Sequence, residues 1–183
     1  MKMKWGIDHT WTLFLDRDGV INERIMGAYV RSIDEFKFLQ EIPETIAQLS
    51  TIFGRVIVVT NQQGIGKGLM TERNLEEVHA YMCAKVEAHG GKIDYCFYAP
   101  ELDGAENNMR KPQPGMALKA KEHYPEIQFD RSVMVGDADS DIVFGQQLGM
   151  KTVRVRTVEP IGIHADETVV SLSEFLKSLK NEK

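Results

Sequence analysis

The chain alternates between short apolar runs and longer segments in which apolar residues recur every three or four positions. The short runs predict buried strands, and the longer segments predict helices with one apolar face. The predicted strands cover residues 12–15, 56–59, 94–99, 132–136 and 152–155. Because strands and helices alternate, right-handed crossovers are expected to place the strands side by side in one mostly parallel sheet of an α/β fold.

Residue types that start and stop helices bound the segments between these strands. The first helix is expected to begin at Pro43 and end before Gly54, and the second to run from its cap Thr71 to about His89. Further helices are predicted from Pro114, over residues 142–148 and from Ser173. Residues 23–41 show no sustained period and are expected to form a loop with a short hairpin over the ends of the strands.

The length and net charge of the chain limit the kinds of protein, and the partners, that the sequence is compatible with. The 183 residues suffice to bury a sizeable core, and a single domain over residues 1–183 is expected. A formal net charge of -5 gives no basic patch for nucleic acid or for an anionic membrane, so neither partner is expected. No apolar run approaches the roughly 20 residues of a membrane span, and the start of the chain lacks the apolar stretch of a signal peptide. These features predict a cytoplasmic protein that is a monomer or a small homo-oligomer.

The residue types that often ligate transition metals are few. Cys83 and Cys96 fit no metal-ligand spacing or disulfide framework and are expected to be buried, reduced thiols. His79 and His89 have no second ligand at metal spacing and are expected on the surface. None of the four is therefore a candidate for chemistry.

Polar and charged residues follow four of the predicted strands. In chain order they are Asp16 and Asp18, Thr60 and Asn61, Arg110 and Lys111, and Asp137. Taken singly, these groups are explained at least as well by an acidic turn, a turn-forming pair or a solvated Arg-Lys turn. Taken together they favour a site, because the carboxyl ends of parallel strands meet at one edge of a sheet, where ligands bind in open α/β folds.

The predicted edge concentrates negative charge. Four acidic residues are expected near one another there: Asp16, Asp18, Asp137 and the nearby Asp141. Repulsion of several kcal/mol would raise the pKa values of these carboxyl groups unless a cation were present. Oxygen ligands alone suit Mg²⁺, which also accepts a phosphate oxygen. Because the Lys111 ammonium and the Thr60 hydroxyl suit the other phosphate oxygens, the sequence predicts phosphoryl-transfer chemistry.

These motifs resemble those of the haloacid dehalogenase (HAD) superfamily, which occur here in order over roughly residues 10–156: DRDGV at Asp16, VTN at Thr60, RKP with Lys111 and GDADSD at Asp137. The resemblance implies a HAD-like fold, a Rossmann-like three-layer sandwich. It also implies that Asp16 is the nucleophile that forms an aspartyl-phosphate and that Asp18 is the general acid and base. Asp16, the main-chain carbonyl of Asp18 and Asp137 would then hold Mg²⁺.

A narrower resemblance lies in DRDGVIN, TNQ-x-GI-x-x-G and RKP-x-PGM. These stretches are similar to those of the D-glycero-D-manno-heptose 1,7-bisphosphate phosphatases and the related histidinol-phosphate phosphatases, which lack a large cap domain. In the heptose family Arg110 and Asn61 would contact the sugar or its second phosphate. Two departures stand out. The zinc loop usual before the RKP motif is absent, since Ala99 and Met109 stand where thiolates are expected, and the segment 23–30 is slightly longer than usual.

Three functions remain open from the sequence. The first is a Mg²⁺-dependent phosphomonoesterase for a small phosphorylated metabolite, with heptose 1,7-bisphosphate favoured over histidinol phosphate. The second is a non-catalytic phospho-acceptor or metal-binding module, but a domain that keeps its acyl phosphate gains nothing from an acid and base at Asp18. The third is a polynucleotide 3'-phosphatase, against which the acidic balance and the lack of a basic stripe count.

Overall fold

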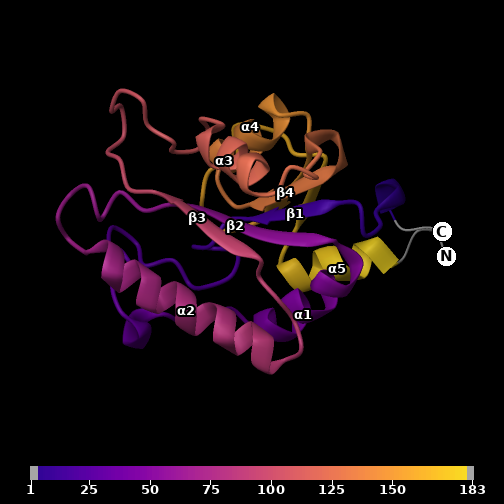
Figure 1. The fold of residues 1–183 in the computed structure, drawn as a ribbon, viewed down its shortest axis with the longest axis horizontal. Coiled ribbons are helices and arrows are strands. Elements are labelled where there is room, and N and C mark those ends of the chain that lie inside the picture. The colour runs from indigo at the N-terminus through magenta and orange to yellow at the C-terminus, as the bar shows by residue number, and fades with distance from the viewer. Residues whose placement is uncertain (1–3, 181–183) are drawn as a thin grey trace.

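The computed structural model describes residues 4–180 and is built on a sheet of six strands in the order β3-β2-β1-β4-β5-β6 (Figure 1). The strands are β1 (Thr12–Leu15), β2 (Arg55–Asn61), β3 (Tyr95–Ala99), β4 (Ser132–Gly136), β5 (Lys151–Val155) and β6 (Glu167–Val169). Every pair of neighbouring strands is parallel. Because β1 lies between β2 and β4, the first strand of the chain occupies the middle of the sheet. The predicted α/β fold with a mostly parallel sheet is confirmed.

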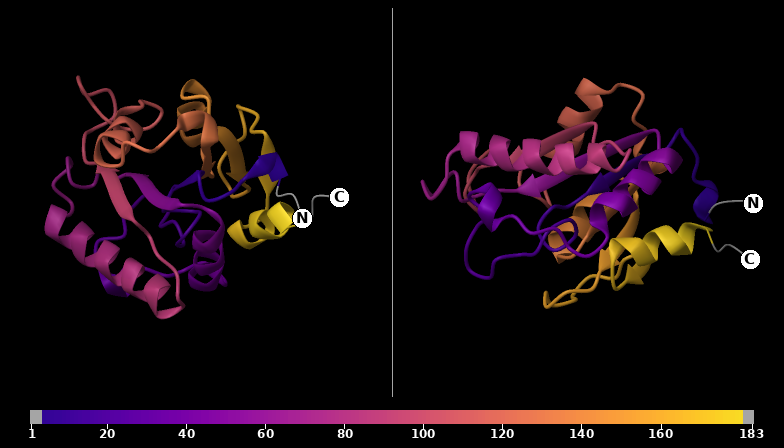
Figure 2. Two further views of the ribbon diagram at one scale, coloured as in Figure 1. Left: turned by 45° about the vertical axis from the view of Figure 1, so that its right-hand side comes forward. Right: turned by 90° about the horizontal axis from the view of Figure 1, so that it is seen from below.

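Helices cover both faces of the sheet. The α-helices of the described part are α1 (Ile42–Ile52), α2 (Glu72–Ala88), α3 (Gly115–His123), α4 (Asp139–Gln147) and α5 (Leu172–Lys180), and the 3₁₀-helices are η1 (Lys4–Gly6), η2 (Ile33–Glu35) and η3 (Phe129–Arg131). Figures 1 and 2 show α1, α2 and α5 on one face and α3 and α4 on the other, which makes the expected three-layer sandwich. Within residues 4–180 no inserted segment folds into a separate cap domain, and no helix has the length and apolar content to cross a membrane.

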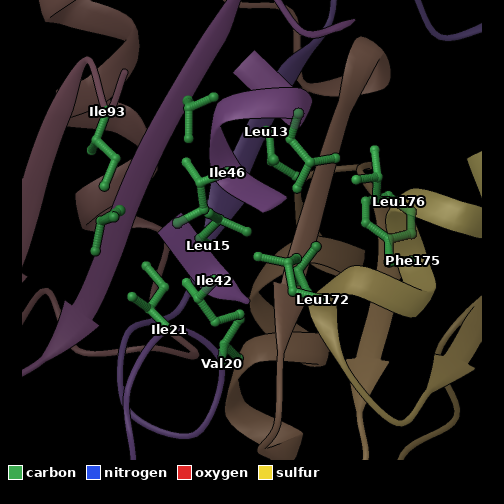
Figure 3. Packing of buried hydrophobic residues seen from close by; sticks show 14 of the residues in the cluster. Leu13, Leu15, Val20, Ile21, Ile42, Ile46, Ile93, Leu172, Phe175 and Leu176 are labelled. Atoms are coloured by element: carbon green, nitrogen blue, oxygen red, sulfur yellow. The ribbon is translucent and has the colours of Figure 1, made fainter. Parts of the chain in front are cut away.

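The central strand contributes to two hydrophobic cores. Side chains alternate along a strand, so Leu13 and Leu15 point to one face of β1 and Phe14 to the other. On the first face they pack in one cluster with residues of α1 and α5 such as Ile46 and Phe175 (Figure 3). Phe14 belongs to a second, smaller cluster beneath α3 and α4. Burial on both faces explains why Leu13, Phe14 and Leu15 are apolar in succession and do not alternate with polar residues.

Three elements differ from the sequence-based expectation. The strand β2 runs past its apolar stretch, because Thr60 and Asn61 continue the parallel pairing with β3. The three-residue strand β6 was not predicted, since a strand this short shows no clear alternation. The hairpin expected within residues 23–41 is reduced to a single bridge between Asn22 and Phe38.

Two expectations about cysteine and histidine also change. The surface position expected for His79 is wrong: only 8% of the residue is exposed, whereas His89 is exposed as expected. His79 lies four residues after Leu75 and is therefore on the buried stripe of α2. Cys83 and Cys96 are free thiols that are only partly buried.

Candidate active site

The carboxyl ends of β1 and β2 open into a cleft of about 470 Å³. Six of the residues predicted from the sequence line this cleft: Asp16, Asp18, Thr60, Asn61, Arg110 and Lys111. The seventh, Asp137, follows β4 and is buried beside Asp16. The predicted convergence of the strand ends is therefore present in the fold.

Three buried carboxylates form the acidic centre of the site. Oxygen atoms of Asp16, Asp137 and Asp141 all lie within 4.8 Å of one another, close enough to share one cation. Burial and the charge of Asp141 raise the pKa of Asp16 to about 7. Burial, with Asp141 adding to it, raises the pKa of Asp137 to about 6. The side chain of Asp18, which the sequence grouped with these acids, lies outside the cluster.

Both the side-chain nitrogen and the backbone of Lys111 are held by hydrogen bonds. Its Nζ donates to Asp16 Oδ1 at 2.7 Å and to the main-chain oxygen of Val59 at 2.7 Å, and it lies 2.6 Å from Asp141 Oδ1. Burial acts to lower the pKa of Lys111, but Asp141 and Asp16 together raise it above its ordinary value. The side chain of Asn61 accepts from the Lys111 main-chain N at 2.9 Å and donates to its carbonyl at 3.1 Å. Asn61 therefore holds the backbone of Lys111 in place as well as lining the cleft.

Asp18 is held by three residues that donate hydrogen bonds to its carboxylate. Arg17 Nη2 donates to both of its oxygens at 3.0 and 3.1 Å, Asn22 Nδ2 to Oδ1 at 2.9 Å and Gln62 Nε2 to Oδ2 at 2.9 Å. Burial acts to raise the pKa of Asp18, but Arg17, Asn22 and Gln62 bring it below its usual value. Asp18 is thus a fixed, ionised carboxylate at the wall of the cleft.

Asp137 is held from the loop that follows the first motif. Arg24 Nη2 donates to Asp137 Oδ1 at 2.8 Å and to the main-chain oxygen of Asp18 at 3.2 Å, while Nη1 donates to Glu159 Oε1 at 2.6 Å. Thr157 Oγ1 donates to the other oxygen, Asp137 Oδ2, at 3.1 Å. Arg24 therefore neutralises part of the acidic centre.

The backbone after Asp18 fits closely against Asp137. Gly19 has a positive φ of 94°, and a Cβ atom at this position would overlap the carboxylate of Asp137. Only glycine combines that backbone conformation with so close an approach. The glycine of the DRDGV motif thereby allows the ends of β1 and β4 to meet.

Arg110 provides unpaired donors at the rim of the cleft. Its side chain is 14% exposed, its Nε lies 4.0 Å from Asp103 Oδ1, and its Nη1 has no hydrogen-bond partner within residues 4–180. The preceding residue, Met109, is partly buried against the core cluster beneath α3. The loop that lacks cysteine and histidine is thus anchored here by apolar packing.

The sequence did not single out four residues that shape the site: Arg17, Gln62, Arg24 and His79. Arg17 is fully buried, and its Nη1 lies 3.4 Å from His79 Nε2. A signal for Arg17 was available, because the residue between two that face a ligand points the other way on an extended chain. Gln62 belongs to the TNQ stretch quoted above, but neither that stretch nor the residues around Arg24 indicate which group each side chain contacts.

Comparisons with known proteins agree with this geometry. Residues 108–173 match the HAD-hydrolase-like family model. The D-glycero-D-manno-heptose-1,7-bisphosphate 7-phosphatase of Chlorobaculum tepidum is 36% identical over 157 residues, which are 79% of this chain and 78% of that protein. The D-glycero-alpha-D-manno-heptose-1,7-bisphosphate 7-phosphatase of Mycobacterium bovis is 33% identical over 171 residues, covering 91% of this chain and 90% of that protein.

A solved structure extends the similarity to the whole fold. The D,D-heptose 1,7-bisphosphate phosphatase from B. bronchiseptica, complexed with magnesium and phosphate, superimposes with a TM-score of 0.82. It is 27% identical in sequence, and the match covers 94% of this chain and 99% of that one.

Proposed function

Since the chain belongs to the heptose bisphosphate phosphatase family of the HAD superfamily, we propose that it is a Mg²⁺-dependent phosphatase acting on D-glycero-D-manno-heptose 1,7-bisphosphate. By analogy with the activity that these relatives are named for, the phosphate removed is the one on carbon 7. The observation that carries the proposal is the meeting of Asp16, Lys111 and Asp137 around one point at the edge of the sheet. We further propose that the whole chain is one domain and acts in the cytoplasm.

The residues of the acidic centre suit Mg²⁺. All three carboxylates are oxygen donors, they are buried within 4.8 Å of one another, and the raised pKa values of Asp16 and Asp137 reflect their burial and mutual repulsion. Asp16, the main-chain carbonyl of Asp18 and Asp137 would hold the ion, with Asp141 beside them. When bound, the ion would supply positive charge that offsets the repulsion between the Asp16 carboxylate and the phosphate of the substrate.

In the first chemical step Asp16 is the nucleophile. A carboxylate oxygen of Asp16 forms a bond to phosphorus while the bond from phosphorus to the sugar oxygen breaks, which gives an aspartyl-phosphate. Asp18 is ionised in the free protein, so it first takes up a proton, from the monoanionic phosphate of the bound substrate or from water. It then transfers this proton to the departing sugar oxygen, so the sugar leaves as a neutral alcohol. The ammonium of Lys111 and the hydroxyl of Thr60 offset the charge on the phosphate oxygens.

The second step regenerates the enzyme. Asp18, now a carboxylate, accepts a proton from a water molecule as that water attacks phosphorus. The bond between phosphorus and Asp16 breaks, and inorganic phosphate leaves. Arg110 also lines the cleft, and its guanidinium, whose Nη1 has no hydrogen-bond partner within residues 4–180, is the group proposed to bind the second phosphate of the substrate.

The test is release of inorganic phosphate from a panel of substrates with Mg²⁺ or with a chelator. The panel contains both anomers of the heptose 1,7-bisphosphate, histidinol phosphate and a 3'-phosphorylated oligonucleotide. The proposal expects steady, Mg²⁺-dependent turnover, with the highest kcat/KM on one of the heptose bisphosphates.

The remaining outcomes separate the alternatives. If the protein prefers histidinol phosphate or the oligonucleotide, the proposed substrate is wrong and the proposed phosphatase chemistry stands. One equivalent of phosphate bound stably to the protein, without turnover, would instead indicate a phospho-acceptor module.

A further inference from the structure

We propose that Gln62 is a positioning residue that fixes the carboxylate of Asp18 relative to the phosphate-binding Thr60. The inference rests on the proposed function, in which Asp18 gives a proton to the departing sugar oxygen. It adds a role to a residue that has neither a charge nor a nucleophilic atom.

One nitrogen of Gln62 joins two of the proposed catalytic groups. Its Nε2 donates to Asp18 Oδ2 at 2.9 Å and to Thr60 Oγ1 at 2.9 Å. The two acceptors come from different strands, since Asp18 follows β1 and Thr60 lies in β2. The amide nitrogen therefore sets the separation between the proton donor and a ligand of the phosphate.

The position of Gln62 is itself rigid. The residue is 1% exposed, and its main-chain N donates to the carbonyl of Ala99 at 2.8 Å, one residue beyond the pairing of β2 with β3. A buried side chain on an anchored backbone has few alternative rotamers. Gln62 can therefore hold Asp18 in one position, which a side chain with several accessible rotamers could not do.

Gln62 acts on the oxygen that Asn22 does not reach. Asn22 Nδ2 donates to Asp18 Oδ1, and Arg17 Nη2 approaches both oxygens from the buried side. Without Gln62, Oδ2 would keep only Arg17, and the carboxylate would be less restrained against rotation about its χ2 bond. Proton transfer depends on geometry within hydrogen-bond reach, so such a rotation weakens acid catalysis while leaving Asp16 in place.

Leaving-group dependence reports this effect selectively. A sugar oxygen needs a proton as its bond to phosphorus breaks, whereas p-nitrophenolate is stable enough to leave without one. The parameter kcat/KM covers the steps up to release of the alcohol and excludes hydrolysis of the aspartyl-phosphate. Loss of the contact between Gln62 and Thr60 would reduce kcat/KM for both substrates by the same factor. A larger loss of kcat/KM on the sugar than on the nitrophenyl ester therefore reports the effect on proton transfer from Asp18.

The experiment compares Gln62→Met with the wild type on heptose 1,7-bisphosphate and on p-nitrophenyl phosphate. The expected result is a loss of kcat/KM of roughly 10- to 100-fold on the sugar and of less than about threefold on the nitrophenyl ester. Gln62→Leu, which has a similar volume and no hydrogen-bond donor, is expected to show the same selectivity. Gln146→Met is the matched control, because this glutamine donates to the carbonyl of His164 far from the cleft.

A double-mutant cycle with Asp18→Asn uses the sugar substrate alone. If Gln62 acts through Asp18, Gln62→Met costs almost nothing further in the Asp18→Asn background. Equal losses on both substrates, or full additivity in the cycle, would overturn the positioning role. An Asp18→Asn variant with wild-type kcat/KM on the sugar would instead show that the proposed acid and base is wrong. Mg²⁺-dependent thermal stabilisation of each variant verifies that it is folded.

Discussion

Arg24 binds Asp137 through Nη2 at 2.8 Å, and the same nitrogen lies 3.2 Å from the main-chain oxygen of Asp18. These are two of the oxygens proposed to hold Mg²⁺. The guanidinium and the ion therefore compete for them, and Glu159, which binds the other end of the guanidinium, offers it a second anion. We therefore expect Arg24 to weaken the binding of metal at this site.

The first prediction is that Arg24→Met tightens Mg²⁺ binding. In the wild type, Mg²⁺ must displace the charged hydrogen bond between Arg24 and Asp137, which makes the free energy of binding less favourable. Removing this bond is therefore expected to lower the Kd for Mg²⁺ by about tenfold. Isothermal titration calorimetry measures the Kd directly and needs no substrate.

Lys67→Met is the charge-matched control for this measurement. Lys67 also lines the cleft, but its Nζ donates to the hydroxyl of Tyr29 at 3.1 Å and not to the acidic centre. Its removal is expected to change the Kd for Mg²⁺ much less. If both variants bind Mg²⁺ more tightly than the wild type and to the same extent, the loss of positive charge in the cleft explains the effect, and competition by Arg24 is excluded.

The second prediction concerns pH and the acidic centre. The pKa of Asp16 is about 7 and that of Asp137 about 6, both above the ordinary value of 3.8. Between about pH 4 and pH 7 these two groups therefore bind more protons in the folded protein than in the unfolded chain. Without divalent ions, their contribution to the free energy of unfolding falls as pH rises through this window. Mg²⁺ offsets the repulsion between ionised carboxylates, so it should raise the Tm more at about pH 8 than at about pH 5.

Thermal unfolding in chelator and in Mg²⁺ at the two pH values checks this prediction. Asp137→Asn removes one of the two titrating groups and should flatten the dependence of the Tm on pH in chelator. A Tm increment from Mg²⁺ that is the same at both pH values would contradict the proposed repulsion.

The sequence predicted the reacting groups because their signals are local. An apolar run that ends in Asp16 and Asp18, or in Asp137, is visible within a few residues, and the parallel sheet then brings the ends together. The partners of these groups have no such signal. Arg24 and Asp137 are 113 positions apart, and Gln62 and Asp18 are 44 apart, so only the folded chain shows that they meet.

The error at His79 has a different origin. Its spacing from Leu75 and Met82 fits the buried stripe of α2, but a histidine with no second metal ligand nearby was expected on the surface. The partner that makes burial tolerable is Arg17, which stands 62 positions earlier.

The third prediction separates the two aspartates of the first motif. Asp16→Asn is expected to abolish turnover, because the amide cannot form the aspartyl-phosphate. Asp18→Asn should lower kcat on the sugar bisphosphate by about 10²- to 10⁴-fold, the usual contribution of general acid and base catalysis. Phosphate release under saturating substrate measures both, with the exposed Asp130→Asn as the control for loss of one carboxylate. Turnover at the normal rate in Asp16→Asn would rule out the covalent route.

The last prediction is that His79 makes the protein sensitive to acid. Burial and the charge of Arg17 lower the pKa of His79 to about 3, from an ordinary value of 6.5. Between these two values His79 carries a proton in the unfolded chain and none in the folded protein, so the contribution of His79 to the free energy of unfolding falls as pH drops through the window. One proton contributes at most about 1.4 kcal/mol per pH unit.

His79→Gln removes this proton and keeps a polar side chain that can accept from Arg17. The slope of the free energy of unfolding against pH should therefore decrease by up to about 1.4 kcal/mol per pH unit between about pH 4 and pH 6. Urea unfolding at several pH values gives this slope, and His89→Gln, at an exposed position, is the matched control. If the slope is unchanged in His79→Gln, the histidine is not held neutral in the folded protein, and its burial beside Arg17 does not limit stability in acid.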